Sequence, residues 1–257
     1  MRRKLAVCAA FLLLSMMPLL AGKAAKQPRP KTQKELEVLQ KVQAAAQAGN
    51  VDDELAAINN VLENFVDTEF KPQLLVMALQ ASERKNDYAL IVTWSERLLQ
   101  SDPNDIDARV ALAEATARHT RENDLDKADS IKKIQDNANK ALELLKTANT
   151  PPAGVPDAQW PEVKKDLTGR AYVALGQAAT LDKKFPDALT QYKAAVAADP
   201  APAMKAYLAK SYVENKQYDD AITTADQVIA DASAPAVVKQ FAQSQKDVAT
   251  KLKGGAK

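Results

Sequence analysis

Two neighbouring stretches of the chain carry the same residue types in the same order, about 33 positions apart. Large side chains, small side chains and prolines follow one another at helical spacing. The first stretch has Tyr172, Leu175, Gly176, Ala179, Phe185, Ala188, Tyr192, Ala195 and Pro200, and the second has Leu208, Ala209, Tyr212, Tyr218, Ala221, Ala225 and Val228. A period of about 34 residues is typical of helix–turn–helix units, which bury their apolar faces only against their neighbours. The period therefore predicts an array of helical hairpins.

An earlier stretch, residues 72–103, fits the same spacing less fully. It has Ala78, Leu79, Tyr88, Leu98 and the helix-ending Asp102-Pro103, and it departs from the pattern at Ile91, where the later units have alanine. Residues 34–67 form a weaker unit with a turn at Gly49-Asn50, a pair that favours a helix end. The stretch 106–149 begins like a repeat at Leu112 and Ala113, but a longer second helix and a charged loop interrupt the pattern between about 119 and 157.

These spacings resemble the tetratricopeptide repeat (TPR) family. The resemblance implies an all-α fold, a right-handed solenoid of about five helical hairpins with a C-terminal capping helix. The expected helices cover 35–48, 52–65, 71–84, 88–100, 106–118, 125–147, about 158–181, 187–198, 203–214, 219–230 and 235–253. In the capping helix the apolar face is expected at Val238, Phe241, Ala242, Val248 and Leu252, and a polar outer face would keep the array soluble.

The first residues predict export. Arg2, Arg3 and Lys4 precede an apolar run at 5–21, and the small residues Ala21, Gly22, Ala24 and Ala25 follow it. This order is typical of a secretory signal peptide, here residues 1–24, with cleavage between 21 and 25 and a periplasmic or envelope location. The alternative is an uncleaved anchor, because the run of about 17 residues is at the lower limit for a bilayer span.

The rest of the chain divides at changes in composition. Residues 25–34 are expected to form a basic, proline-containing linker, followed by N-terminal TPR-like helix pairs at 35–147 and a proline-rich loop at 148–157. The C-terminal repeats and the capping helix fill 158–253, and 254–257 form a tail. The basic arm 23–34 is interpreted either as a spacer or as a segment that makes weak electrostatic contact with an anionic envelope surface.

The sequence offers little for catalysis. Its one cysteine, Cys8, lies in the predicted signal peptide, and its one histidine, His119, lies between arginines at a predicted helix end. Without a glycine-rich phosphate loop or a nucleophile motif, we expect no enzyme, no cofactor and no metal site. The acidic turn 102–107 is interpreted as a helix cap at Asn104 or Asp105. A net charge of +2 gives no reason to expect a nucleic-acid partner.

The resemblance implies a binding mode, because partners of TPR proteins usually dock on the inner curve lined by the first helices. Carried over to this chain, those places are Val76, Met77, Gln80, Glu83, Arg84, Val110, Glu114, Arg118, Val173, Gln177, Lys210 and Glu214. The Lys/Asn set that clamps a peptide carboxylate in some members is absent. Trp160 is interpreted either as a packing residue or as a partner contact.

The leading hypothesis is therefore an exported scaffold that holds a protein or peptide partner on its concave face. The alternatives are a structural or self-associating envelope spacer and, with less support, a helical glycan-active enzyme. The sequence identifies neither the partner nor the oligomeric state.

Overall fold

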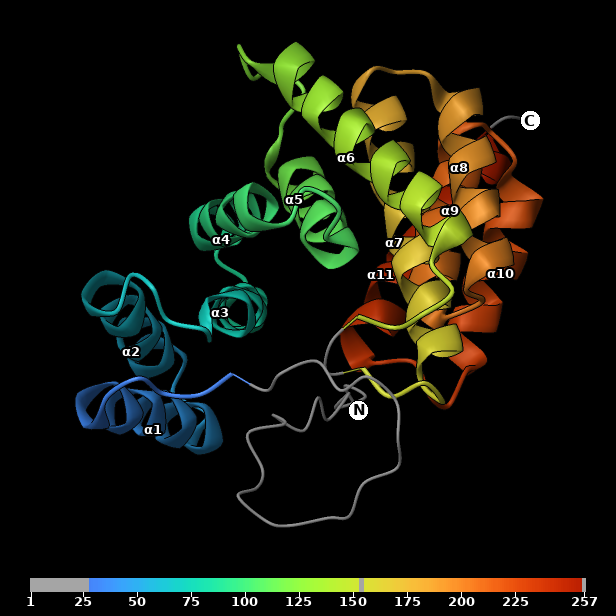
Figure 1. Ribbon diagram of the computed structural model, residues 1–257. Coiled ribbons are helices and arrows are strands. Elements are labelled where there is room, and N and C mark those ends of the chain that lie inside the picture. Colours follow the sequence, from blue (N-terminus) through green and yellow to red (C-terminus); the bar gives the residue numbers. More distant parts are fainter. Residues whose placement is uncertain (1–27, 153–154, 256–257) are drawn as a thin grey trace. The chain divides into compact units, whose positions relative to one another are not determined.

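The computed structural model describes residues 28–152 and 155–255 and is helical throughout (Figure 1). In these residues there are eleven α-helices and no strand, which confirms the all-α prediction. The helices are α1 (Gln33–Ala48), α2 (Val51–Asn64), α3 (Lys71–Lys85), α4 (Tyr88–Ser101), α5 (Ile106–His119), α6 (Lys127–Thr147), α7 (Trp160–Leu181), α8 (Phe185–Ala198), α9 (Pro202–Glu214), α10 (Tyr218–Ala230) and α11 (Ala236–Gly255). The predicted signal peptide lies outside the described residues.

The chain divides into two compact units, and the boundary falls within α5, between Ala111 and Leu112. In the N-terminal unit (28–111), α1 pairs with α2 and α3 with α4, and α2 also contacts α3. In the C-terminal unit (112–255), α6 packs on α7, α7 pairs with α8 and α9 pairs with α10 (Figure 1). The last helix, α11, contacts both α9 and α10. Each unit thus consists of consecutive packed helices. Most are joined by short turns, as the repeat predicts, whereas the longer connections 120–126 and 148–159 flank α6, where the pattern is interrupted.

Polar caps fix several helix starts. Thr32, Asn50 and Asp87 each accept a hydrogen bond from the backbone N–H three residues later, at 3.1, 3.2 and 3.2 Å. Asp105 does the same for Ala108 at 2.8 Å, so of the two predicted caps it is Asp105 that caps α5. These bonds satisfy N–H groups that have no partner inside the helix. At the end of α1, Gly49 has a φ of 71°, a left-handed conformation that glycine adopts without strain.

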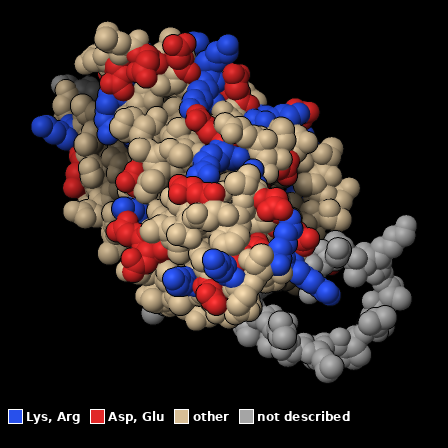
Figure 2. All heavy atoms as spheres, turned by 60° about the vertical axis from the view of Figure 1, so that its left-hand side comes forward, with Lys and Arg blue, Asp and Glu red and all other residues tan. Residues whose placement is uncertain are grey.

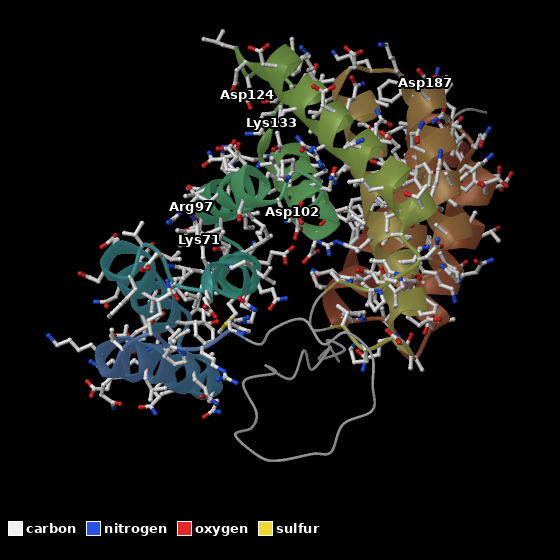
Figure 3. The ribbon with its side chains drawn as sticks, viewed as in Figure 1. Lys71, Arg97, Asp102, Asp124, Lys133 and Asp187 are labelled. Carbon is white, nitrogen blue, oxygen red and sulfur yellow. The ribbon has the colours of Figure 1, made fainter. Side chains whose placement is uncertain are left out.

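In the N-terminal unit, Trp94 is a packing residue. Its side chain is buried in α4, and the guanidinium of Arg97 lies 4.3 Å from the ring centroid. Arg97, which Figure 3 labels, also donates a long hydrogen bond of 3.4 Å to Asn59 Oδ1 on α2. The stacked guanidinium therefore links the two second helices of this unit.

The capping helix α11 corrects one detail of the predicted apolar face. Val238, Phe241 and Ala242 pack on the core formed with α9 and α10, as expected. Val248 and Leu252 are instead exposed. Successive residues of a helix point 100° apart, so when Ala242 and Ala249 face the core, Val248 faces sideways.

Candidate functional site

The twelve residues expected to contact a partner all lie on first helices of hairpins. The boundary within α5 divides them into a set of six in the N-terminal unit and a set of six in the C-terminal unit. The first set comprises Val76, Met77, Gln80, Glu83, Arg84 and Val110, and the second comprises Glu114, Arg118, Val173, Gln177, Lys210 and Glu214.

In the N-terminal set, three side chains on α3 are partly accessible. Val76, Met77 and Gln80 are each half-buried. Arg84 is half exposed and forms an ion pair with Glu54 of α2, whose side chain is only 2% exposed. Because Arg84 compensates a buried carboxylate, it holds α3 against α2. Val110 is fully buried, so it packs within the protein and offers no surface to a partner.

In the C-terminal set, Glu114 is tied to a residue that the sequence reasoning did not single out. Arg170 of α7 donates two hydrogen bonds to Glu114 Oε2, from Nε at 2.9 Å and from Nη2 at 2.7 Å. The two side chains are only 21% and 14% exposed, and Asp166 Oδ2 lies 3.7 Å from the same guanidinium. Arg170 lies two helical turns before Gln177, so helical spacing places both on one face of α7.

Tyr207 of α9 lies at the centre of this face and also escaped the sequence reasoning. Its ring stacks on Tyr192 with centroids 5.9 Å apart and planes 3° apart, and it contacts the Phe241 ring at 5.9 Å. Burial is the main cause that raises the pKa of Tyr207; the Glu114 charge adds to the shift. Gln177 of α7 slightly opposes this rise in the pKa of the Tyr207 hydroxyl. Tyr207 thus connects α8, α9 and α11, and helical spacing from Lys210 could have identified its face.

The remaining members of the C-terminal set differ in accessibility. Val173 is buried in the hairpin core. Lys210 and Glu214 form an ion pair along one side of α9. Arg118 is exposed in the last turn of α5, and it forms no ion pair with the residues described in 28–152 and 155–255. The positive charge of Arg118 opposes the rise in the pKa of Tyr207, so the guanidinium lies near the Tyr207 hydroxyl.

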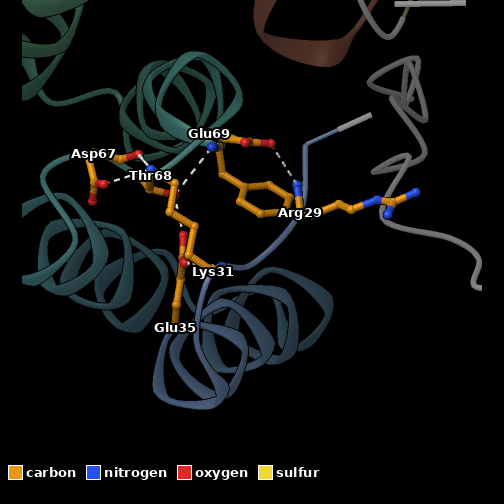
Figure 4. Close-up of polar contacts among 7 residues, drawn as sticks. Arg29, Lys31, Glu35, Asp67, Thr68 and Glu69 are labelled. Atoms are coloured by element: carbon orange, nitrogen blue, oxygen red, sulfur yellow. Dashed lines mark hydrogen bonds and ion pairs between the residues drawn. The ribbon is translucent and has the colours of Figure 1, made fainter. Parts of the chain in front are cut away.

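The described part of the basic arm is attached to the N-terminal unit (Figure 4). Lys31 Nζ donates to Asp67 Oδ2 at 2.6 Å and to the Asp67 carbonyl oxygen at 2.7 Å, and the Arg29 N–H donates to Glu69 Oε2 at 3.1 Å. The side-chain hydrogen bond between Lys31 and Asp67 is the largest cause that raises the pKa of Lys31 and lowers the pKa of Asp67. The Lys31 charge is therefore already compensated within the unit, while Lys23 and Lys26 lie outside the described residues.

Beneath these contacts, Glu35 of α1 is almost fully buried. Its carboxylate accepts hydrogen bonds from the Lys31 N–H at 2.6 Å and from the Thr68 hydroxyl at 2.6 Å (Figure 4). The carboxylate therefore fastens the arm and the start of α1 to the turn that precedes α3. Thr32 and Glu35 have the spacing of a capping box, the sequence signal that would have placed the start of α1 at residue 33.

Trp160 packs inside the C-terminal unit. Its side chain is buried, and its indole Nε1 donates to the Ala148 carbonyl at 3.3 Å. A hollow of about 500 Å³ beside it is lined in part by Lys164 and Lys165. Lys164 donates to the same carbonyl, and Lys165 pairs with Glu162. Both ammonium groups are thus engaged, and Trp160 is a packing residue.

Charges of both signs are interspersed across the face in view in Figure 2. Among residues 28–152 and 155–255, no group of three His, Asp or Glu side chains is placed to hold a metal ion. His119 lies exposed at the end of α5. No helix in the described ranges is both long enough and apolar enough to cross a bilayer.

No family model matches the chain, and no curated protein matches it significantly. Solved structures do match. TTC0263, a thermophilic TPR protein of Thermus thermophilus, is 14% identical over 82% of this chain and 98% of its own, with a TM-score of 0.55. MamA from Desulfovibrio magneticus RS-1 is 18% identical over 78% of this chain and 96% of its own, with a TM-score of 0.50. A further MamA structure is 12% identical over 85% and 95%, with a TM-score of 0.52. At such identities the likeness establishes the fold alone.

Proposed function

We propose that this chain, whose helical hairpins have a TPR-like fold, is an exported scaffold that binds a protein or peptide partner on the concave face of its first helices. One observation carries the proposal. Helices α5, α7, α9 and α11 of the C-terminal unit carry polar and aromatic side chains in two contacts: Arg170 binds Glu114, and the Tyr207 ring contacts the Phe241 ring. Gln177 of α7 is half-buried on the same face as Arg170. Such a surface offers both hydrogen-bonding groups and apolar area to a partner.

The proposed role is non-catalytic. The chain's single histidine is exposed, and two acidic groups of these helices are engaged, Glu114 by Arg170 and Glu214 by Lys210. Carboxylates held in ion pairs serve packing and recognition better than proton transfer. Export is proposed from the signal-like residues 1–24, and N-terminal sequencing of the mature protein tests it. An intact Met1 would contradict cleavage.

A crosslinked pulldown from the envelope fraction tests the binding face. We would compare the wild type with the double variant Gln80→Lys/Gln177→Lys, which changes one half-buried first-helix glutamine in each unit. The matched control is Gln135→Lys on α6, where the glutamine is exposed on a second helix. We expect the double variant to lose the partner and the control to keep it, with both folded by circular dichroism. Equal recovery from all three proteins would refute the first-helix faces as the binding surface.

A self-associating spacer is the second candidate, and the exposed apolar side chains of α11 are the observation that favours it. Size-exclusion chromatography with light scattering separates the two candidates. A mass that increases with protein concentration supports self-association, and a monomer at all concentrations contradicts it.

A further inference from the structure

The capping helix α11 carries an apolar stripe that the core does not cover. Val237, Val248 and Leu252 are 71%, 42% and 44% exposed, and they are three of the five large hydrophobic side chains exposed in the described residues. They share one side of the helix with Phe241. Along the chain, the order Val237, Phe241, Val248, Leu252 gives spacings of four, seven and four residues, and each spacing returns to the same side of a helix. An exposed apolar cluster of this kind marks a contact surface.

The register between α9 and α11 shows where this stripe lies. Three pairs of residues 34 positions apart pack alike: Met204 and Val238, Tyr207 and Phe241, Leu208 and Ala242. By the same offset, Ala203, Lys210 and Glu214 of α9 correspond to Val237, Ser244 and Val248 of α11. The stripe therefore continues the face of α9 that carries Lys210 and Glu214. The contact of the Tyr207 and Phe241 rings, 5.9 Å between centroids, joins the two helices along that face.

The register also argues against a second copy that stacks on the end of the array. The α9 residues that face α10 and α11 include Ala206 and Ala209, both buried. Their counterparts on α11 are Gln240 and Gln243, both polar and exposed. The end of the array is thus closed by polar side chains, and the apolar stripe lies on the side of α11 that continues the Lys210 and Glu214 face of α9.

At the other side of the unit, a row of equivalent positions ends in an uncompensated positive charge. Three positions on other helices are equivalent to Val248: Glu214 on α9, Leu181 on α7 and Arg118 on α5. Counted from each position to the next, the spacings are 34, 33 and 63 residues. Glu214 is paired with Lys210, whereas Arg118 is exposed without an ion pair in the described residues. The row thus runs from an apolar side chain on α11 to a guanidinium on α5.

We propose that the face formed by α5, α7, α9 and α11 binds an extended peptide with apolar side chains on the α11 stripe and a carboxylate on Arg118. This inference rests on the proposed scaffold function and specifies its partner. Packed helices lie about 9 Å apart, so three intervals set an upper limit of about 27 Å on the distance across the face. An extended chain covers about 3.3 Å per residue, which places the acidic residue within about eight positions of the apolar residue.

Selection of a phage-displayed random dodecapeptide library on the full mature chain tests this. We expect the wild type to enrich peptides in which an apolar residue and an acidic residue lie within about eight positions of each other, at one fixed spacing and in one fixed order. Arg118→Glu should replace the selected acid by Lys or Arg, and Val248→Lys should replace the selected apolar residue by an acid. Lys132→Glu on α6 and Leu125→Lys in the turn before it are the matched controls, because both side chains are exposed and neither lies on α5, α7, α9 or α11. They should select the wild-type consensus.

Three outcomes would overturn the inference. The first is the same consensus from Arg118→Glu and Val248→Lys as from the wild type. The second is no enrichment by the wild type. The third is a wild-type dimer that Val248→Lys converts to a monomer, which would assign the stripe to a second copy of this chain. The pulldown with Gln80→Lys/Gln177→Lys tests the scaffold function independently of the peptide selection. If that variant still loses a protein partner, the face binds a folded surface instead of an extended peptide.

Discussion

Gly176 of α7 faces the ring of Tyr192 of α8 so closely that no side chain fits between them. A Cβ at residue 176 would lie 2.7 Å from both Cε1 and Cζ of that ring. Tyr192 is 1% exposed and stacks on Tyr207, so its ring has no free space in which to move. The small residue of the repeat pattern is thus explained by the close approach of two helices within one hairpin.

We expect Gly176→Ala to destabilise the C-terminal unit by about 2 kcal/mol, because overpacking outweighs the gain of about 1 kcal/mol in helix propensity. Urea denaturation followed by circular dichroism measures this. Gly169→Ala is the control, since its Cβ would meet the Asp199 Cβ at 3.1 Å and the Met204 methyl at 3.2 Å. A smaller loss is expected there. A Gly176→Ala protein as stable as the wild type would contradict the close approach.

The ion pair between Arg170 and Glu114 predicts a second effect. Arg170→Met leaves the mostly buried Glu114 carboxylate without its donors, and we expect a loss of about 2 kcal/mol in the free energy of unfolding. The double variant Arg170→Met/Glu114→Met should recover most of that loss, because no charge is then buried. Lys165→Met breaks the exposed pair with Glu162 and should change stability little. Equal losses in the single and double variants would refute the interpretation.

The sequence predicted the helices well because their signals are local. Apolar spacing, Gly49 and the Asp-Pro turn mark helix faces and ends within a few residues, and the Asp105 cap follows from its position in such a turn. Residues that act between helices were harder to find. Helical spacing gives the faces on which Arg170 and Tyr207 lie, but it could not identify their partners on α5 and α11, since periodicity gives the face of a residue and not the side chain opposite it.

Buried hydroxyls provide a third prediction in the N-terminal unit. Ser95 and Ser82 are both fully buried, but the Ser82 hydroxyl donates to the Ala78 carbonyl at 2.7 Å, whereas the Ser95 hydroxyl has no hydrogen-bond partner among the described residues. A buried polar group without a partner is costly, so Ser95→Ala should stabilise the protein by about 1 kcal/mol. Ser82→Ala, the matched control, should be close to neutral. Thermal denaturation of both variants decides, and a loss of stability in Ser95→Ala would indicate a hydrogen bond to that hydroxyl.

The cap of α5 predicts a pH dependence. Burial, with the Asp107 and Asp102 charges adding to it, raises the pKa of Asp105 to about 6, although the Ala108 N–H favours the ionised form. The folded protein therefore holds this proton more tightly than the unfolded chain, whose aspartate has a pKa of about 3.9. Lowering the pH through the window from about 6 to about 4 should remove the cost of the buried charge, and that cost should be fully present above pH 6.

Asp105→Asn tests this dependence, because asparagine caps a helix equally well and carries no charge. We expect Asp105→Asn to be more stable than the wild type by about 2 kcal/mol at pH 8, with the difference shrinking toward zero at pH 4. Asp105→Ala removes both the charge and the cap, so it should fall below Asp105→Asn by about 1 kcal/mol at every pH. Urea denaturation of the three proteins between pH 4 and pH 8 measures these differences. A gain in Asp105→Asn that stays constant over the whole range would show that the Asp105 carboxyl does not titrate in this window.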